Sequence, residues 1–142
     1  LSKLSKAILN NDPEAMEKYL YDLLVNALGS NMLTHEHVYQ GFITGLLMNV
    51  RGQYTVTAEM ENGKGRYDIM LRSASSKSPN IVMELKRSDS ESSLQHDAEM
   101  ALRQIMERDY IHDLSGDTIL YGISFKGKQP FIVSKAVTAN SV

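Results

Sequence analysis

Two short stretches, residues 65–72 and 81–86, constrain the fold of this chain most, because each alternates with a period of two. Such a period is typical of β-strands, whose successive side chains point to opposite faces of a sheet. One face of each stretch is apolar, whereas the other carries Asp68 in the first stretch and Glu84 and Lys86 in the second. We therefore expect two strands that bury one face in a core and present charged groups on the opposite face.

Asp68, Glu84 and Lys86 have the chemistry of a metal-dependent hydrolytic site. If the two strands pair as neighbours, Asp68 comes alongside Glu84, and Lys86 points the same way as Glu84. Clustered carboxylates supply the hard oxygen ligands that Mg²⁺ prefers, and a nearby lysine can hold or deprotonate a water. Without metal, we expect Lys86 to relieve the repulsion between the carboxylates. The alternative is a structural charge network, because such networks also gather carboxylates.

The composition narrows the class of protein. The chain has 142 residues, 42% of them hydrophobic and 23% charged, which fits one globular domain in a soluble protein. The absence of cysteine excludes disulfides and thiolate zinc sites and favours a reducing, cytoplasmic location. No apolar run approaches the length of a membrane span. The net charge of −2 counts against a dedicated nucleic-acid binder, although an enzyme with a local basic patch can have this total.

The spacing of apolar residues predicts further helices and strands around the two alternating stretches. The expected helices cover residues 12–28, 34–50 and 91–109, with Asp12 and Thr34 as the caps of the first two. The expected strands cover residues 53–61, 118–125 and 130–134, and the last eight or so residues should be frayed.

The order of these elements, ααβββαββ, predicts an α/β fold with a mixed sheet and helices packed on it. The turn from Asn62 to Gly65 should join strands 53–61 and 65–72 as a hairpin. The link from strand 81–86 through a helix to strand 118–125 is a β-α-β crossover, which joins parallel strands.

Two polar residues on the predicted helices are further candidates for the site. Glu36 falls on the margin of the apolar stripe of helix 34–50, where it either stabilises the helix N-terminus or serves the site. Gln104 lies at the edge of the buried stripe of helix 91–109, from which it could reach over an adjoining sheet. A histidine metal site on His35 and His37 is disfavoured, because the two side chains should lie on opposite faces of the helix.

These pieces, in this order and spacing, resemble the PD-(D/E)xK nuclease superfamily. The resemblance is closest to a bacterial branch in which the nuclease-like domain follows an AAA-ATPase-like domain, and it covers about residues 34–130. It is carried by Glu36 to Leu47, Glu59, Gly65 to Leu71, Val82 to Lys86, Ala101 to Ile105 with Tyr110, and Tyr121 to Lys128.

The resemblance implies a restriction-endonuclease-like α/β/α core that hydrolyses phosphodiester bonds with Mg²⁺, for which Mn²⁺ can substitute. Asp68 and Glu84 would ligate the metal, and Lys86 would position or activate the attacking water. Glu36 would support the metal or the lysine, and Gln104 would orient the site from its helix.

This sequence departs from the family pattern at two places. The residue before Asp68 is Tyr67 rather than proline, a common variation that weakens the resemblance little. Gln40 stands where a histidine is expected in this branch, so any role of that histidine is absent here.

The resemblance also implies an organisation and partners. We expect one nuclease-like domain over residues 1–142, with a helical lead-in at 1–33 and a core at 34–134, as the C-terminal part of a longer protein. The implied partners are nucleic acid, with DNA favoured over RNA, an N-terminal ATPase-like domain and a second copy in a homodimer, with no membrane. The alternative is that the chain is a catalytically silent regulatory module on the same fold, which binds nucleic acid or a partner.

A basic rim should flank the carboxylates. The turn after strand 118–125 should open on the same edge of the sheet as the end of strand 81–86, and a phosphate backbone there would need positive charge. The candidates for this contact are Arg66, Arg87, Lys126 and Lys128. The alternative is that Lys126 and Lys128 are solvated turn residues.

Overall fold

A computed structural model describes residues 1–29, 31, 35–62, 65–108 and 114–138 of the chain. The predicted cap Thr34, the turn residues 63 and 64, and Tyr110 lie outside these ranges, as do the side chains of residues 59–67. Among the described helices, none combines the length and the apolar character that crossing a lipid bilayer requires.

The structure contains the three predicted helices and one that the sequence reading missed. The α-helices are α1 (Lys3–Leu9), α2 (Pro13–Ala27), α3 (Glu36–Leu46) and α4 (Leu94–Met106). The missed helix α1 has only seven residues, too few to show a periodic pattern, and begins where the Ser2 hydroxyl accepts the Ser5 N–H. Asp12 caps α2 as predicted, because its carboxylate accepts the Ala15 N–H.

Five strands form one mixed sheet in the order β1-β2-β3-β4-β5. Their bounds are β1 (Tyr54–Asn62), β2 (Gly65–Ser73), β3 (Asn80–Arg87), β4 (Thr118–Lys126) and β5 (Gln129–Val137). Among these five described strands the crossover pair β3–β4 is parallel, and the other neighbouring pairs are antiparallel. The prediction that about the last eight residues are frayed is wrong for the start of that segment, because β5 continues to Val137, which pairs with Thr118.

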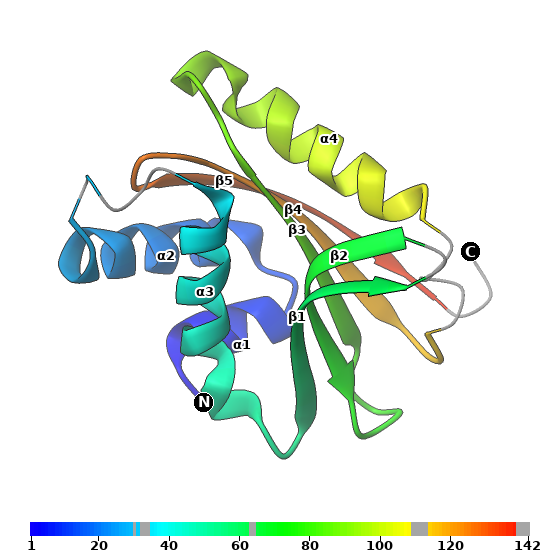
Figure 1. Cartoon of the computed structure of the whole chain (residues 1–142). Helices are drawn as coiled ribbons and strands as arrows, with labels where there is room; N and C mark the ends of the chain where they lie inside the picture. Colours follow the sequence, from blue (N-terminus) through cyan, green and yellow to red (C-terminus); the bar gives the residue numbers. More distant parts are fainter. Residues whose placement is uncertain (30, 32–34, 63–64, 109–113, 139–142) are drawn as a thin grey trace.

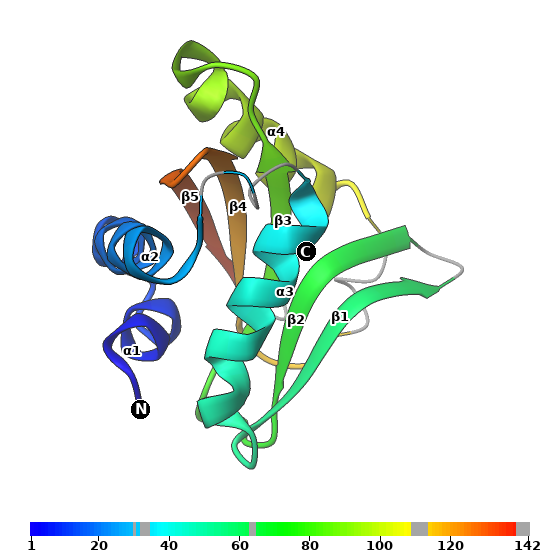
Figure 2. The same cartoon turned by 60° about the vertical axis from the view of Figure 1, so that its left-hand side comes forward.

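The helices cover both faces of the sheet, so the predicted α/β/α fold is confirmed. Figures 1 and 2 show α1, α2 and α3 on one face and α4 on the other. A large apolar core lies between the sheet and the first three helices, and a smaller apolar cluster lies under α4.

The alternation seen in the sequence decides which of these two layers each strand residue joins. Ile69 and Met83, on adjacent strands, point into the larger core. Their neighbours Met70 and Val82 point into the smaller cluster beside α4. The charged face of β2 and β3 therefore looks toward α4.

Candidate active site

The pairing of β2 with β3 places the two predicted carboxylates opposite each other. The ladder pairs Ile69 with Met83 and Leu71 with Ile81, and the same register, continued by one residue, sets Asp68 opposite Glu84. Both side chains are buried, with relative exposures of 7% for Asp68 and 5% for Glu84. Beyond this point the β1–β2 hairpin curves away from β3 (Figures 1 and 2).

Asp68 is held through both its side chain and its backbone. Its carboxylate oxygen Oδ2 accepts the Leu85 N–H at 2.7 Å, so a β2 side chain bonds the β3 backbone. Its backbone carbonyl oxygen accepts a hydrogen bond of 2.8 Å from Nε2 of Gln40, a buried residue of α3. These two bonds fix the carboxylate and the backbone of Asp68, whose place on the α4 side of the sheet follows from the alternation along β2.

Gln40 is a residue whose contribution the sequence reading missed. The sequence signal was a polar residue inside an apolar helical stripe, one turn after Glu36. A buried amide needs partners, because an unsatisfied one costs free energy. Gln40 finds its acceptor on the strand that carries Asp68, so it connects α3 to the site.

Glu84 forms an ion pair with Arg108, which the sequence reading also missed. Nη1 of Arg108 lies 3.5 Å from Oε1 of Glu84. Glu84 thus has a basic partner from just beyond α4, whereas the sequence reading expected Lys86 or metal to relieve the charge of the carboxylates. The available signal was the spacing, since Arg108 follows Gln104 by four residues, about one helical turn.

A glycine allows α4 to approach the site closely. Gly122 of β4 pairs with Glu84 of β3. A Cβ atom at Gly122 would collide with the Ala98 carbonyl oxygen and lie 2.6 Å from the Leu102 nitrogen. The backbone of α4 therefore rests directly on β4, beside the strand that bears Glu84.

A hydrogen bond two residues further along β4 also holds α4. The Ser124 hydroxyl donates to the Leu94 carbonyl at 2.6 Å, and both residues are buried. With Gly122, this bond sets the height of α4 over the sheet and so the position of Arg108.

The side chains of the other predicted catalytic residues form no hydrogen bond or ion pair with the two carboxylates within the described ranges. Lys86 is half-buried on the same face of β3 as Glu84, and its side chain forms no hydrogen bond or ion pair with any described residue. Glu36 is exposed in the first turn of α3, and Gln104 is half-exposed on α4. Within the described ranges neither side chain forms a hydrogen bond or an ion pair. The structure thus assembles Asp68, Glu84 and Lys86 on adjacent strands.

The ends of β3 and β4 lie at one edge of the sheet. The Ser88 N–H, just past β3, donates to the Phe125 carbonyl near the end of β4 at 2.7 Å. Lys126 and Lys128 are half-exposed around the following turn. The Tyr39 hydroxyl of α3 donates to the Gly127 carbonyl at 2.6 Å and holds this turn.

Of the two predicted rim arginines, the structure describes one side chain. Arg87 is exposed at the end of β3, and its Nη1 lies 3.9 Å from Oδ1 of the fully exposed Asp89. The backbone of Arg66 pairs with Glu61 in the β1–β2 hairpin, and its side chain lies outside the described residues.

The donor set of the site suits a hard divalent cation. Asp68 and Glu84 offer carboxylate oxygens, and in the described ranges no group of three or more His, Cys, Asp or Glu side chains gathers to hold a metal. Mg²⁺ commonly binds through one or two carboxylates and completes its shell with water and substrate phosphate, so the two carboxylates fit it.

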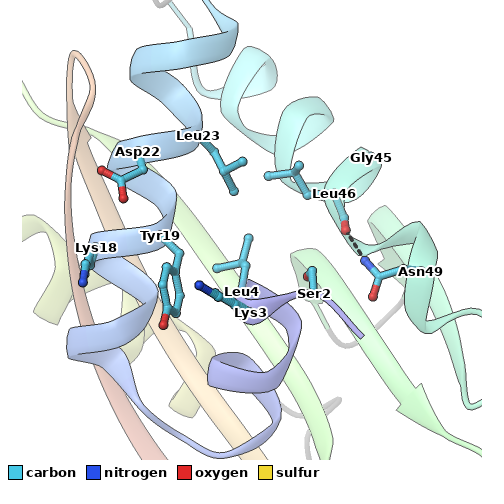
Figure 3. Close-up of a pocket in the computed structure, with 10 residues that line it drawn as sticks. All are labelled: Ser2, Lys3, Leu4, Lys18, Tyr19, Asp22, Leu23, Gly45, Leu46 and Asn49. Carbon is cyan, nitrogen blue, oxygen red and sulfur yellow. Dashed lines mark hydrogen bonds between the residues drawn. The ribbon is translucent and has the colours of Figure 1, made fainter.

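A sizeable cavity lies away from this site. It is a groove of about 800 Å³ between α1, α2 and α3 (Figure 3). Leu4, Leu23 and Leu46 provide apolar walls, and Lys18 and Asp22 lie on its rim. None of the predicted site residues lines it.

Comparisons with known proteins give one informative match. The family model described as PD-(D/E)XK nuclease superfamily matches residues 34–135. A search of curated proteins finds no match. Among solved structures, SSO0001 is 19% identical with a TM-score of 0.33, and the match covers 85% of this chain and 59% of that chain. This chain thus corresponds to less than two thirds of SSO0001.

Proposed function

The chain belongs to the PD-(D/E)XK nuclease superfamily, and from this premise we propose that it hydrolyses phosphodiester bonds in nucleic acid. The observation that carries the proposal is the placement of Asp68 opposite Glu84, with Lys86 on the same face and without a described ionic partner. The α4 side of the sheet would then be the face at which the phosphodiester is cut.

In this proposal the two carboxylates hold a divalent metal. Asp68 and Glu84 would bind Mg²⁺, or Mn²⁺ in its place, and the metal would neutralise phosphate charge and acidify water. The Leu85 N–H fixes one oxygen of Asp68, so the carboxylate presents a constant orientation. Gln40 adds to this by fixing the backbone at the same residue.

Lys86 is the residue that we assign to the attacking water. Its side chain lies two residues after Glu84 on the same face of β3. An ammonium group there can hold the water and stabilise the negative charge that develops on the phosphate. Glu36 and Gln104 would support the site from α3 and α4.

The basic rim would bind the phosphate backbone without reading base sequence. Arg87, Lys126 and Lys128 lie where β3 and β4 end, and Arg66 belongs to the adjacent hairpin. DNA is the first substrate to test. The proposal also places the protein in the cytoplasm and gives it a single nuclease-like domain, with a lead-in at 1–33 and a core at 34–134. This domain would follow an ATPase-like domain and form a homodimer.

The test is a cleavage assay with the purified protein on single- and double-stranded DNA and RNA. We expect cleavage with Mg²⁺ or Mn²⁺ and none with EDTA. Lys86→Ala should reduce the rate at least about 100-fold, the lower bound for losing a positioned proton-transfer group. Lys77→Ala, which alters an exposed lysine in the β2–β3 loop, is the matched control and should stay within twofold. Cleavage that is unaffected by Lys86→Ala would contradict the proposal.

A second candidate function is a silent binding module on the same fold. The Glu84–Arg108 ion pair favours it, because a basic side chain already stands at a proposed metal ligand. A calorimetric titration in which Mg²⁺ and Mn²⁺ both fail to bind would support this alternative. Robust cleavage by the protein would exclude it.

A further inference from the structure

The Glu84–Arg108 contact is more than an ordinary surface ion pair. The side chain of Glu84 is only 6% exposed, and that of Arg108 is 25% exposed. Ion pairs that are shielded from water are screened by salt much less than exposed pairs. The charge of Arg108 therefore acts strongly on this carboxylate.

The fold positions Arg108 through a short, well-anchored connection. Arg108 follows the last residue of α4 by two positions, and its N–H donates to the Ile105 carbonyl at 3.1 Å. Ile105 is fully buried in the small cluster under α4. Because Gly122 seats α4 directly on β4, the start of the Arg108 side chain is fixed relative to Glu84.

A guanidinium group carries a permanent positive charge and cannot leave a carboxylate by losing a proton. A divalent cation bound to Glu84 would share that carboxylate with a like charge. Metal binding must therefore move Arg108 away from Glu84 or proceed against its repulsion. Either way, metal affinity is lower than the two carboxylates alone would give.

We propose, on the basis of the function proposed above, that Arg108 is a positioning residue that occupies Glu84 in the metal-free protein and exchanges with the divalent cation. A phosphate of the substrate is a natural partner for the displaced side chain, since guanidinium groups bind phosphate in a bidentate manner. Nucleic acid that draws Arg108 away from Glu84 would thereby promote metal binding. The site would then hold its metal mainly when substrate is bound.

The experiment is a calorimetric titration of Mn²⁺ into the metal-free protein without nucleic acid, so that it needs no cleavage. We expect Arg108→Gln to bind Mn²⁺ at least fivefold more tightly than the natural chain. Arg108→Lys keeps the positive charge and should stay within about twofold. Arg103→Gln removes an exposed arginine of α4, five residues before Arg108, and is the matched control, with no expected change.

The outcomes separate this inference from the proposed function. If the natural chain binds Mn²⁺ and Arg108→Gln binds it equally or more weakly, the proposed role of Arg108 is overturned, while the proposed metal site still stands. Absence of Mn²⁺ binding in all four proteins would overturn the metal site and this inference together. Melting curves with and without Mn²⁺ guard against misfolding, because a folded Arg108→Gln protein should gain more thermal stability from Mn²⁺ than the natural chain.

Discussion

The two faces of strands β2 and β3 are built from alternate residues of the same segments, yet they differ in almost every physical respect. One face places Ile69, Leu71 and Met83 against α1, α2 and α3, and it contributes only apolar side chains to the core. The other face carries Asp68 and Glu84 toward α4, with a few apolar neighbours. Both faces gain free energy by burying apolar side chains, but on the second face the buried carboxylates oppose that gain.

The difference shows how a small domain can hold buried charge. Removing a carboxylate from water is costly unless it is hydrogen-bonded or paired. Asp68 has the Leu85 N–H, and Glu84 has Arg108, so each cost is partly offset by a specific partner. The apolar face, which three helices cover, supplies the stability that the charged face does not.

The largest expected effect comes from separating α4 from the charged face. Gly122→Ala should lower the free energy of unfolding by about 3 kcal/mol, because the added methyl group would collide with the backbone of α4. Urea denaturation measures this loss. The control is Gly41→Ala on α3, where nothing lies within 4 Å and alanine should add about 0.5–1 kcal/mol. A loss below 1 kcal/mol at Gly122 would mean that α4 is not seated tightly.

A smaller loss in the free energy of unfolding is expected at Asp68, where two substitutions separate the role of the carboxylate as a hydrogen-bond acceptor from the role of its charge. Asp68→Ala should cost about 2 kcal/mol without metal, because it removes the carboxylate acceptor of the buried Leu85 N–H. Asp68→Asn keeps an acceptor oxygen and removes a buried charge, so its loss should be clearly smaller. Urea denaturation of the two variants in EDTA gives the comparison. Equal losses would show that the charge, not the hydrogen bond, stabilises the strand pair.

The smallest effect tests a hydroxyl on the apolar face. The Tyr121 hydroxyl donates to the Ile8 carbonyl at 2.6 Å and joins α1 to the sheet. Tyr121→Phe should therefore cost about 1 kcal/mol at neutral pH, the net value of a typical hydrogen bond. Thermal melting measures it, and Tyr21→Phe, at an exposed position on α2, should change the melting temperature little.

The same hydroxyl gives the apolar face a pH dependence. Burial raises the pKa of Tyr121 above its ordinary value of 10, and the negative charge of Asp12 adds to the shift. The hydroxyl then ionises more readily in the unfolded chain, so its contribution to stability is complete below pH 10 and declines as the pH rises further. Tyr121→Phe should reduce this alkaline decline. Burial also raises the pKa of Tyr39 and Tyr54, so part of it should remain.

Much of the fold could be predicted because it follows from local patterns. The alternation in residues 65–72 and 81–86 and the helix between strands β3 and β4 lead directly to the mixed sheet. Helix α1 escaped prediction, because seven residues carry no clear period and its place depends on contacts with α2. The extension of β5 to Val137 depends on pairing with Thr118, which lies far away in the sequence.

What the sequence by itself determined about this protein is where the longer helices and the main strands lie and which face each residue of those strands occupies. These are properties of neighbouring residues and their period. Only the tertiary structure decided what surrounds the carboxylates. Asp68 meets Gln40 and Leu85 from 28 and 17 residues away, and Glu84 meets Arg108 because Gly122 lets α4 close on the sheet. Such partners depend on how the layers pack in space, which no local period encodes.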